Sequence, residues 1–349
     1  MGVSGVKLKL ASRRGTVLLV TAAAIALCAA WAGALPPLLV EEWYSRRIFP
    51  VISRLLAPLA GILPFSWIDV ALPGALVAVV WVLARRRYRY VLALLAGGYL
   101  FFFLTWGLNY QRMPLVSRLD FAADRVNGAA VESLREEAAS QLNALFGEKE
   151  RALADEATMA ADAAIRVAAV VRELDGTSFP SPSVKTSRIL NPIFRAAGTA
   201  GMFNPFGQEA LVTVPLLAIE RPVIVMHEIA HFMGYANEGE ANFIAFVAAI
   251  HSSQPMTRYS GWLYMWQYLR TRGADGLLDP GPRADLQRID ERRREEQVEW
   301  ISRAGDRTLD TFLRANRVRG GTRSYSEMVS LAVGTRPSWG RFAGVAAAD

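Results

Sequence analysis

Two of the chain's three histidines, His227 and His231, stand four residues apart, and Glu228 lies between them. On a helix, side chains four residues apart share a face and lie about one turn apart, so both imidazoles can reach one metal ion. Glu228 lies about 100 degrees round the helix from His227, where its carboxylate can contact a water on the metal without being a ligand. The spacing therefore predicts a Zn²⁺ site with Glu228 as the general base.

The residues that flank this segment predict where its helix starts and ends. Pro222 suits the first turn of a helix that runs through Met233, and Gly234 suits its end. After a connection of four residues, Gly234 to Asn237, the segment EGEANFIAFVAAIH at 238–251 predicts a second helix that folds back on the first. A third ligand is expected at the start of this second helix.

Glu238 is the predicted third ligand, because it shares a face of the second helix with Asn242 and can bind the metal from there. Asn242 lies four residues further on the same face, where it is expected to support a histidine ligand. Glu240 faces away and is expected to stabilise the N-terminal end of the helix, although it stays an alternative ligand. His251 is 13 residues beyond Glu238, about 20 Å along a continuous helix, and is too far away to join the site.

Two histidines and one carboxylate leave a fourth coordination position open, which is typical of catalytic rather than structural zinc sites. Such a site would hydrolyse peptide bonds with metal-activated water and Glu228. The segment QEALVTVP at 208–215 predicts a strand, and Ala210–Val214 is either an edge strand that holds an extended peptide or an ordinary core strand. Four residues remain unranked as donors to the oxyanion of the transition state: Arg258, Tyr259, Tyr264 and Tyr325.

The remainder of the C-terminal part is expected to be mainly helical. Residues 129–174 are rich in alanine, glutamate and leucine and predict two helices, and a loop rich in serine and proline follows at 177–182. The charged stretch at 283–299 predicts a solvated helix.

The N-terminal part has a different composition. Hydrophobic residues make up 52% of the chain, and three apolar runs approach the length of a membrane span. We therefore predict transmembrane helices at about 16–35, 68–84 and 90–108, followed by a domain at 109–349. The segment 41–67, between the first two spans, is expected to lie at the membrane interface.

The net charge of +7 could suggest a nucleic-acid partner, but 11 of the 39 Lys and Arg and only 3 of the 32 Asp and Glu precede residue 109. The basic excess thus belongs to the predicted membrane part, which predicts a lipid bilayer and no nucleic acid as partner. Basic clusters at 7–14 and 85–89 would lie in the cytoplasm and the C-terminal domain outside it. Ala32-Gly33-Ala34 leaves open a cleaved signal peptide. The only cysteine, Cys28, excludes disulfides within the chain.

His227, Glu228, His231, Glu238 and Asn242 together resemble the gluzincins, zinc metallopeptidases that combine HExxH with a glutamate four residues before an Asp or Asn. Gluzincins usually have a longer connection between the two helices. The frame HExxHxxGxxN at 227–237 is also similar to that of metzincins, whose third ligand would fall at Asn237, but asparagine is a poor zinc ligand.

The chain also resembles an uncharacterised bacterial family of membrane-anchored HExxH proteins. The resemblance rests on LPFS at 63–66, WGLNYQR at 106–112, HEIAH at 227–231 and EGEANF at 238–243. Together with the apolar runs, these resemblances predict a mainly α protein: a membrane domain at 1–108 with three transmembrane helices, and a zincin-like, mostly helical domain with a small strand element at 109–349. The basic clusters and the resemblance to a bacterial family predict the bacterial inner membrane as location, with the catalytic domain on the extracytoplasmic side.

The leading hypothesis is therefore a membrane-anchored zinc metallopeptidase that acts on an extracytoplasmic polypeptide. One alternative is a non-catalytic envelope scaffold with a structural metal, and another is an intramembrane zinc protease. The sequence makes no prediction about the oligomeric state.

Overall fold

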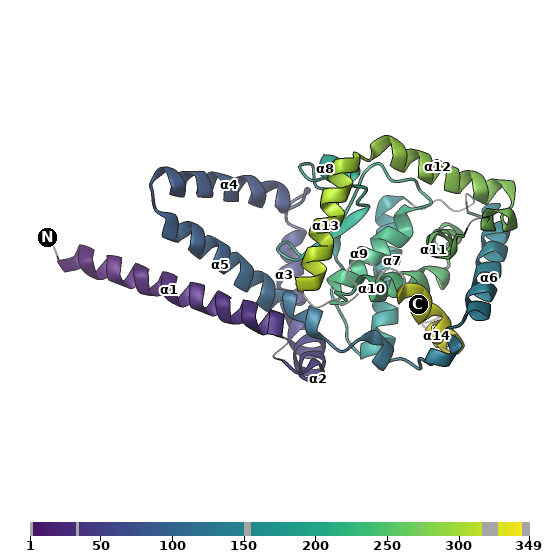
Figure 1. Ribbon diagram of the computed structural model, residues 1–349, viewed down its shortest axis with the longest axis horizontal. Helices are drawn as coiled ribbons and strands as arrows, with labels where there is room; N and C mark the ends of the chain where they lie inside the picture. Colours follow the sequence, from purple (N-terminus) through teal and green to yellow (C-terminus); the bar gives the residue numbers. More distant parts are fainter. Residues whose placement is uncertain (1–2, 33–34, 150–154, 272, 316–326, 344–349) are drawn as a thin grey trace.

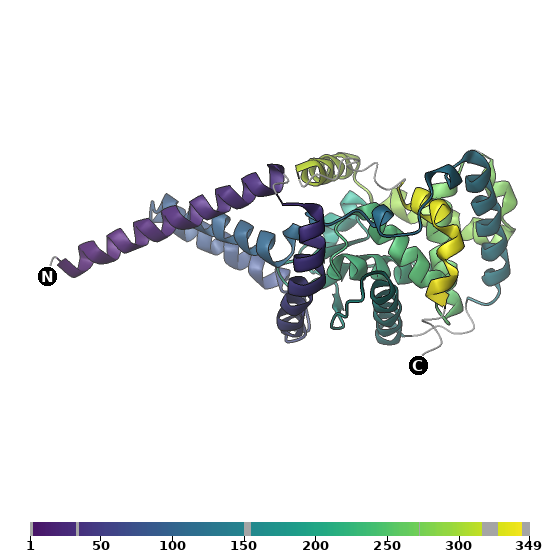
Figure 2. The same cartoon turned by 90° about the horizontal axis from the view of Figure 1, so that it is seen from below.

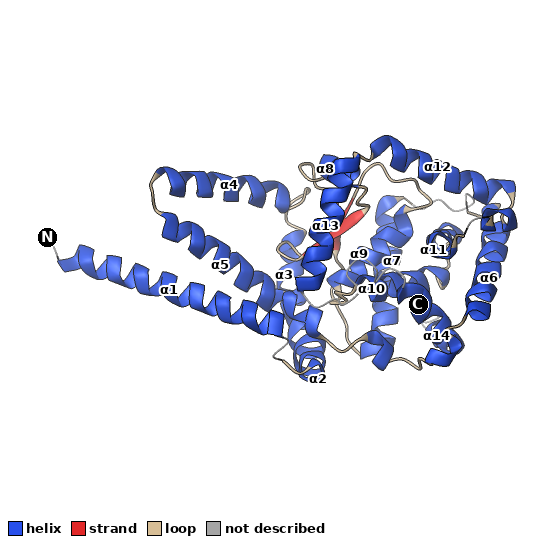
Figure 3. Ribbon diagram, viewed as in Figure 1, coloured by secondary structure: helices blue, strands red, loops and turns tan. Residues whose placement is uncertain are grey.

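The protein is mainly helical, with a helical body from which three helices project as an arm (Figure 1). The computed structural model describes residues 3–32, 35–149, 155–271, 273–315 and 327–343. The prediction of a mainly α chain with a small strand element is confirmed, because the three strands form one short sheet among helices (Figure 3).

The elements follow one another along the chain in three groups. The N-terminal group contains α1 (Val3–Ala32), α2 (Pro37–Leu39), the π-helix η1 (Val40–Ile48), α3 (Phe49–Ala60), α4 (Ile68–Ala84), α5 (Tyr88–Thr105) and the 3-10 helices η2 (Gly107–Gln111), η3 (Leu115–Ser117) and η4 (Ala123–Arg125). The middle group contains α6 (Gly128–Phe146), α7 (Glu156–Asp175), β1 (Ser183–Lys185), α8 (Asn191–Ala197), β2 (Gly201–Asn204), β3 (Glu209–Val212), α9 (Arg221–Phe232) and α10 (Glu238–Ile250). The C-terminal group contains α11 (Pro255–Leu269), η5 (Ala274–Leu277), α12 (Pro280–Glu296), α13 (Glu299–Ala315), α14 (Glu327–Gly334), η7 (Arg336–Ser338) and α15 (Gly340–Ala343).

The arm consists of α1, α4 and α5. Helix α1 lies along α5, and α4 packs against α5 through the turn that joins them (Figures 1 and 2). Many large apolar side chains of these helices are exposed, including Leu18 and Val77. The arm therefore adds little to the core of the body.

The prediction of three transmembrane helices is wrong, because no helix in the part of the chain that the structure describes is long and apolar enough to cross a membrane. Helices α1 and α5 have other bounds than the predicted first and third spans, whereas α4 has the predicted bounds. Helix α4 has 17 residues, fewer than the roughly 20 that a span needs. Helix α5 begins at Tyr88, includes Arg89 and ends at Thr105, so the last residues of the predicted third span belong to other structure.

The remaining predictions about the N-terminal part concern the cleavage site, the location, the bilayer partner and the segment at 41–67. The cleavage site at Ala32-Gly33-Ala34 falls partly outside the described residues, and Cys28 is a free, exposed thiol. The inner-membrane location and the bilayer partner stay predictions. The segment at 41–67 packs on the body, because Tyr44 and Phe49 are buried in the main core, and its position at a membrane interface stays a prediction.

The core of the body is built around α9 and α10. Helix α10 packs on α9, α7, α11 and α14, and nearly all of its side chains are buried. The same apolar cluster includes Val40, Phe49 and Trp106 from the N-terminal group, so the core is continuous across residue 109. The two helices predicted at 129–174 are confirmed as α6 and α7, and the charged stretch at 283–299 lies mostly on α12.

The sheet has the order β1-β3-β2. β1 pairs parallel with β3, and β2 pairs antiparallel with β3 in the register Gly201↔Val212 to Asn204↔Glu209. The strand predicted at 208–215 is thus present as β3, but it is the central strand. The edge-strand alternative for Ala210–Val214 is wrong, because β3 has partners on both sides, and β2 is the edge strand nearest α9.

Glu209, at the start of β3, fastens the segment before α4 to the sheet. Its buried carboxylate accepts hydrogen bonds from the Ser66 hydroxyl at 2.8 Å and the Trp67 amide at 3.1 Å, and it pairs with the Lys185 ammonium at 3.0 Å. The same ammonium also donates to the carbonyls of Leu63 and Phe65. The LPFS segment is therefore held by one ion pair that belongs to two strands.

Replacing Glu209 by Gln should lower the free energy of unfolding by about 2–3 kcal/mol, because it leaves a largely buried ammonium without its counter-charge. Urea denaturation would measure the change. Glu132→Gln is the matched control: its carboxylate pairs with Arg135 at a half-exposed position, and less than about 0.5 kcal/mol is expected. Equal effects of the two substitutions would contradict the role of Glu209.

Candidate metal centre

Helix α9 carries the histidine motif and has the predicted signals at both ends. Pro222 lies in its first turn, where a missing amide costs nothing, and Gly234 adopts φ +88° just after it. The helix ends at Phe232, one residue before the predicted end, and every side chain from Val225 to Phe232 is buried. The motif therefore lies in the core of the body.

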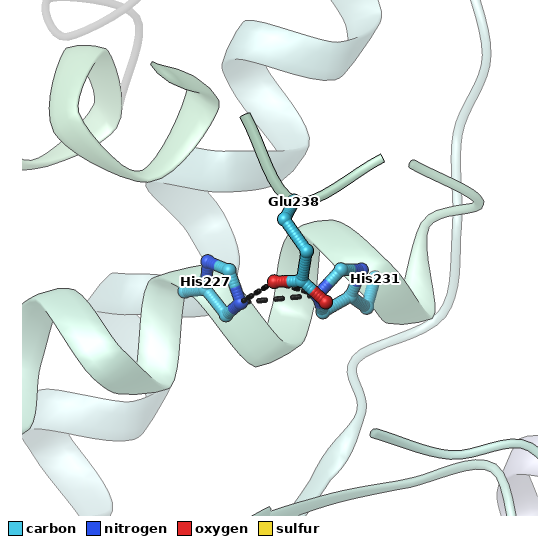
Figure 4. A group of neighbouring side chains, drawn as sticks. All are labelled: His227, His231 and Glu238. Atoms are coloured by element: carbon cyan, nitrogen blue, oxygen red, sulfur yellow. Dashed lines mark hydrogen bonds and ion pairs between the residues drawn. The ribbon is translucent and has the colours of Figure 1, made fainter. Parts of the chain in front are cut away.

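Helix α10 starts four residues after Gly234 and runs back along α9. Asn237 is its N-cap, and its side-chain oxygen accepts a hydrogen bond of 3.1 Å from the Glu240 amide. The capping role explains why the asparagine at the metzincin position does not contribute a ligand. The short connection places Glu238 directly over the two histidines (Figure 4).

The three predicted ligands meet at one point. The Nε2 atoms of His227 and His231 are 3.0 Å apart, and Oε2 of Glu238 lies 3.3 Å from the first and 3.5 Å from the second. Zinc bonds of about 2.0–2.2 Å at tetrahedral angles would separate ligand atoms by about 3.3–3.5 Å. The residues present thus fit one zinc ion, and they form the one such group of His, Cys, Asp and Glu found among the described residues.

The outer nitrogens of the two histidines have different surroundings. Nδ1 of His231 lies 2.7 Å from the carbonyl oxygen of Tyr235, a bond that requires a proton on Nδ1 and leaves Nε2 of a neutral ring free to bind a metal. Nδ1 of His227 is buried and has no hydrogen-bond partner within the described part of the chain.

Electrostatic coupling ties His231 to Glu238. Burial alone would lower the pKa of His231, but the Glu238 carboxylate and, to a smaller extent, Glu228 raise it to about 9. Burial would likewise raise the pKa of Glu238, but His231 and His227 hold it well below its usual range. Without a metal, the His231 imidazole is therefore protonated near neutral pH and the Glu238 carboxylate is ionised.

Glu228 lies beside this group without joining it. A Cβ added to Gly201 would lie 2.5 Å from its Oε1, so β2 approaches the carboxylate closely, and the Phe203 amide donates to it. Its Oε2 is buried and has no partner in the described structure. Burial raises the pKa of Glu228 to about 7, against the opposing effect of the two histidines.

Glu240 and Asn242 have roles other than metal binding. Glu240 faces away, as predicted, and accepts a hydrogen bond from the Leu115 amide. The expectation that Asn242 supports a histidine is wrong: its oxygen accepts from the Tyr264 hydroxyl at 2.8 Å, and its amide donates to the Tyr268 hydroxyl at 3.3 Å. His251 lies one turn beyond Val247, whose carbonyl it contacts, outside the site.

Most of the suggested oxyanion donors are engaged elsewhere. Arg258 donates to the carbonyls of Ser252 and Ser253, and the Tyr259 hydroxyl donates to the buried Asp285. Tyr264 is held by Asn242, and Tyr325 lies outside the described residues. None of the three described candidates is shown to contact a predicted ligand.

Two tyrosines that were not predicted from the sequence, Tyr110 and Tyr268, interact electrostatically with Glu238. The Glu238 carboxylate raises the pKa of both Tyr110 and Tyr268 in addition to the larger effect of burial, which places both phenols in its electrostatic field. Tyr110 belongs to the WGLNYQR segment, and Tyr268 hydrogen-bonds the Tyr264 hydroxyl at 3.0 Å. The sequence signal for this side of α10 was the spacing of Glu238 and Asn242, which places both on one helix face, because Asn242 hydrogen-bonds Tyr268 there.

A buried group of charges, which we call the arginine cluster, holds the turn between α9 and α10. It consists of Glu41, Arg112, Arg118, Asp175 and Tyr235. Arg112 binds Glu41 through two bonds of 2.9 Å, Asp175 at 3.0 Å and the carbonyl of Gly234 at 3.0 Å. The Tyr235 hydroxyl donates to Asp175 at 2.8 Å. Tyr235 belongs to this cluster, and its carbonyl oxygen also hydrogen-bonds Nδ1 of His231. The cluster therefore helps to fix the orientation of the His231 ring.

The segment WGLNYQR reaches the site directly as well as through Arg112. The Trp106 indole donates a 3.0 Å hydrogen bond to the carbonyl of His231, the last ligand of α9. Asn109 accepts a hydrogen bond from Ser45 at 2.9 Å, which joins η1 to η2. The N-terminal group of elements thus surrounds the end of α9.

A protein family described as "Protein of unknown function (DUF3810)" matches residues 44–333. The match covers most of the chain and includes all four segments on which the resemblance rests. No curated protein matches the chain, and no solved structure does.

The His227→Ala variant should bind zinc poorly, because it removes one of the three predicted ligands. Bound zinc should fall from about one ion per chain to roughly a tenth of that after dialysis against a weak chelator. Elemental analysis of the purified protein would measure it. His251→Ala is the matched control, since it removes the histidine that lies outside the site and should leave the zinc content unchanged.

Zinc affinity should depend on pH, because a zinc ion would bind the unprotonated form of His231. The metal-free protein holds a proton on this group below about pH 9, so zinc must displace it. Affinity should therefore rise about tenfold per pH unit towards pH 9 and fall as the pH decreases. Competition with a chromophoric chelator would measure the slope, and a pH-independent affinity would contradict the proton coupling.

Proposed function

We propose that this chain, which belongs to the DUF3810 family of proteins of unknown function, is a zinc-dependent peptidase. The observation that supports this most is the meeting of His227, His231 and Glu238 at zinc-ligand separations, with the buried Glu228 beside them. Three protein ligands leave a coordination position for water or substrate, as catalytic zinc sites require.

A bound zinc ion would supply Lewis-acid chemistry, lowering the pKa of a water and polarising a peptide carbonyl. The residues of the chain would supply the proton transfers. Glu228 is suited to act as general base because burial places its pKa near neutral pH, where it can accept the water's proton and pass it to the leaving amine. The Phe203 amide donates to its carboxylate, and the missing side chain of Gly201 leaves the space that this carboxylate occupies.

The edge strand β2 is suited to hold the substrate. Gly201 lies against Glu228, so an extended peptide paired antiparallel with β2 would carry its backbone to this carboxylate. A side chain at position 201 would displace Glu228, which accounts for glycine there. This arrangement gives β2 the role that the sequence had suggested for β3.

The ligand set supports the resemblance to gluzincins, which we retain as part of the proposal. Glu238 stands four residues before Asn242, as in the gluzincin pattern, and the short connection brings its carboxylate to both imidazoles. Glu240 is engaged with Leu115 and is therefore not proposed as a ligand.

The alternative functions make different demands on the site. An intramembrane protease carries its motif within a spanning helix, whereas α9 has 12 residues and α10 has 13, fewer than the roughly 20 of a span. A scaffold with a structural metal would need the three ligands but would have no need of an uncoordinated buried carboxylate beside them. Glu228 therefore favours the peptidase.

Glu228→Gln should keep the fold and the zinc but slow peptide hydrolysis at least about 10³-fold, because the amide cannot accept the water's proton. Zinc content, thermal unfolding and cleavage of a library of fluorogenic peptides would be measured on the same preparation. Glu132→Gln, an exposed substitution of the same kind, should hydrolyse peptides like the unmodified protein. Activity of Glu228→Gln equal to that of the control would disprove the assignment.

A further inference from the structure

We propose that Glu327, the first residue of α14, is a positioning residue for the predicted metal ligand Glu238, on which it acts through Asn237. The inference rests on the metal centre of the proposed function and deepens it by naming a further residue on which the ligand geometry depends. Glu327 follows Asn237 by 90 residues in the chain, so no local sequence pattern connects the two.

The side chain of Asn237 has a different partner at each end. Its oxygen accepts the 3.1 Å hydrogen bond from the Glu240 amide that caps α10. Its amide nitrogen donates a hydrogen bond of 3.1 Å to Oε2 of Glu327. Asn237 and Glu327 are both partly buried, which limits the competition from water. The two bonds thus join the first turn of α10 to the first turn of α14.

The two partners together select one orientation of the Asn237 amide. If this amide turned through half a rotation, its NH₂ group would face the N–H of Glu240 and its oxygen would face the Glu327 carboxylate. Each contact would then bring together two donors or two acceptors. A side chain that kept only the Glu240 contact would be held less firmly. Glu327 therefore helps to keep the Asn237 oxygen in its capping position.

The cap in turn fixes the backbone of Glu238. Glu238 is the first residue of α10, and the bond between the Asn237 oxygen and the Glu240 amide closes a ring that contains its backbone. From this position its carboxylate lies 3.3 Å from Nε2 of His227 and 3.5 Å from Nε2 of His231. A helix that loses its cap frays at its first turn, and here this turn carries the ligand.

Helix α14 is itself held firmly, so it can keep Glu327 in place. The helix, drawn in yellow in Figure 1, packs on α10, α6 and η4, and its Leu331 is buried in the main core. The carbonyl of Gly334 at its end accepts hydrogen bonds of 3.2 Å from the Ala122 amide and from Arg125. The Glu327 carboxylate is also favoured in the first turn by the partial positive charge of the helix.

The connection between α9 and α10 thus has a partner from outside the hairpin at each end. Arg112, from the N-terminal group of elements, binds the carbonyl of Gly234 at 3.0 Å. Glu327, from the C-terminal group, binds the side chain of Asn237. The ligand geometry therefore depends on residues from all three groups of elements.

Zinc affinity of the full chain tests this role apart from hydrolysis. Glu327→Ala should weaken zinc binding about tenfold, the lower end of the cost of losing an outer partner of a metal ligand. Glu327→Gln should bind zinc within about twofold of the unsubstituted protein, because its amide oxygen can still accept the Asn237 hydrogen bond. Competition with a chromophoric chelator at one fixed pH would measure the dissociation constants.

Glu299→Ala is the matched control, because this glutamate also begins a helix, α13, but its side chain is 83% exposed and pairs with Arg303 on the same helix. The control substitution should leave zinc affinity unchanged.

A double-mutant cycle separates positioning from a general loss of stability. Asn237→Ala removes the cap and should weaken zinc binding at least as much as Glu327→Ala does. Adding Glu327→Ala to Asn237→Ala should cause no further loss, because Glu327 acts through Asn237. If Glu327 only supported the fold, the two losses would multiply. Urea denaturation of the metal-free variants would measure stability separately.

Three results would each overturn the inference: zinc affinity of Glu327→Ala equal to that of the control, weak zinc binding by Glu327→Gln, or losses that multiply in the double variant. An unsubstituted protein without zinc affinity would overturn both this inference and the proposed function. Failure of the peptidase assignment alone would appear as a zinc-loaded protein that cleaves no peptide, a result that leaves the comparison of affinities unchanged.

Discussion

Four residues, Gly234 to Asn237, decide whether the two histidines and Glu238 meet. So short a connection leaves little freedom in how α10 returns along α9, and both of its ends are fixed: Asn237 caps α10, and Arg112 binds the carbonyl of Gly234. The guanidinium is almost fully buried, so its desolvation has to be offset by complete pairing with Glu41 and Asp175. The positions of the three predicted ligands therefore depend on the pairing of Arg112 with Glu41 and Asp175.

The partners of this turn explain why the chain is one folding unit in spite of its change in composition. Glu41 and Arg112 come from the N-terminal group, Asp175 ends α7, and Trp106 hydrogen-bonds the backbone of His231. The segments LPFS and WGLNYQR contain no metal ligand, yet the first is bound to the sheet beside β2 and the second contacts the end of α9. Their function in the structure is to position the motif helix.

The sequence predicted the features that depend on residues close together in the chain, such as the ends of a helix. Pro222 and Gly234 marked the ends of α9, and helical phase was sufficient to choose Glu238 over Glu240. The sequence did not predict the contacts between residues that are far apart in the chain. Asn242 binds tyrosines that are 22 and 26 residues away, and the edge of the sheet depends on which strand lies outermost. The second span was wrong because α4, with the predicted bounds, has only 17 residues, and the third because α5 ends at Thr105, before the apolar run does.

All three predicted ligands fall within the twelve residues from His227 to Glu238, whereas the arginine cluster joins residues from 41 to 235. The entropy lost on closing a loop grows with its length, so the ligand triad is a local contact and the cluster a long-range one. The hairpin of α9 and α10 can consequently form early during folding, before residues of the N-terminal third arrive. Under the proposed function, metal binding by this hairpin and the final docking of that third would be separable events in the maturation of the protein.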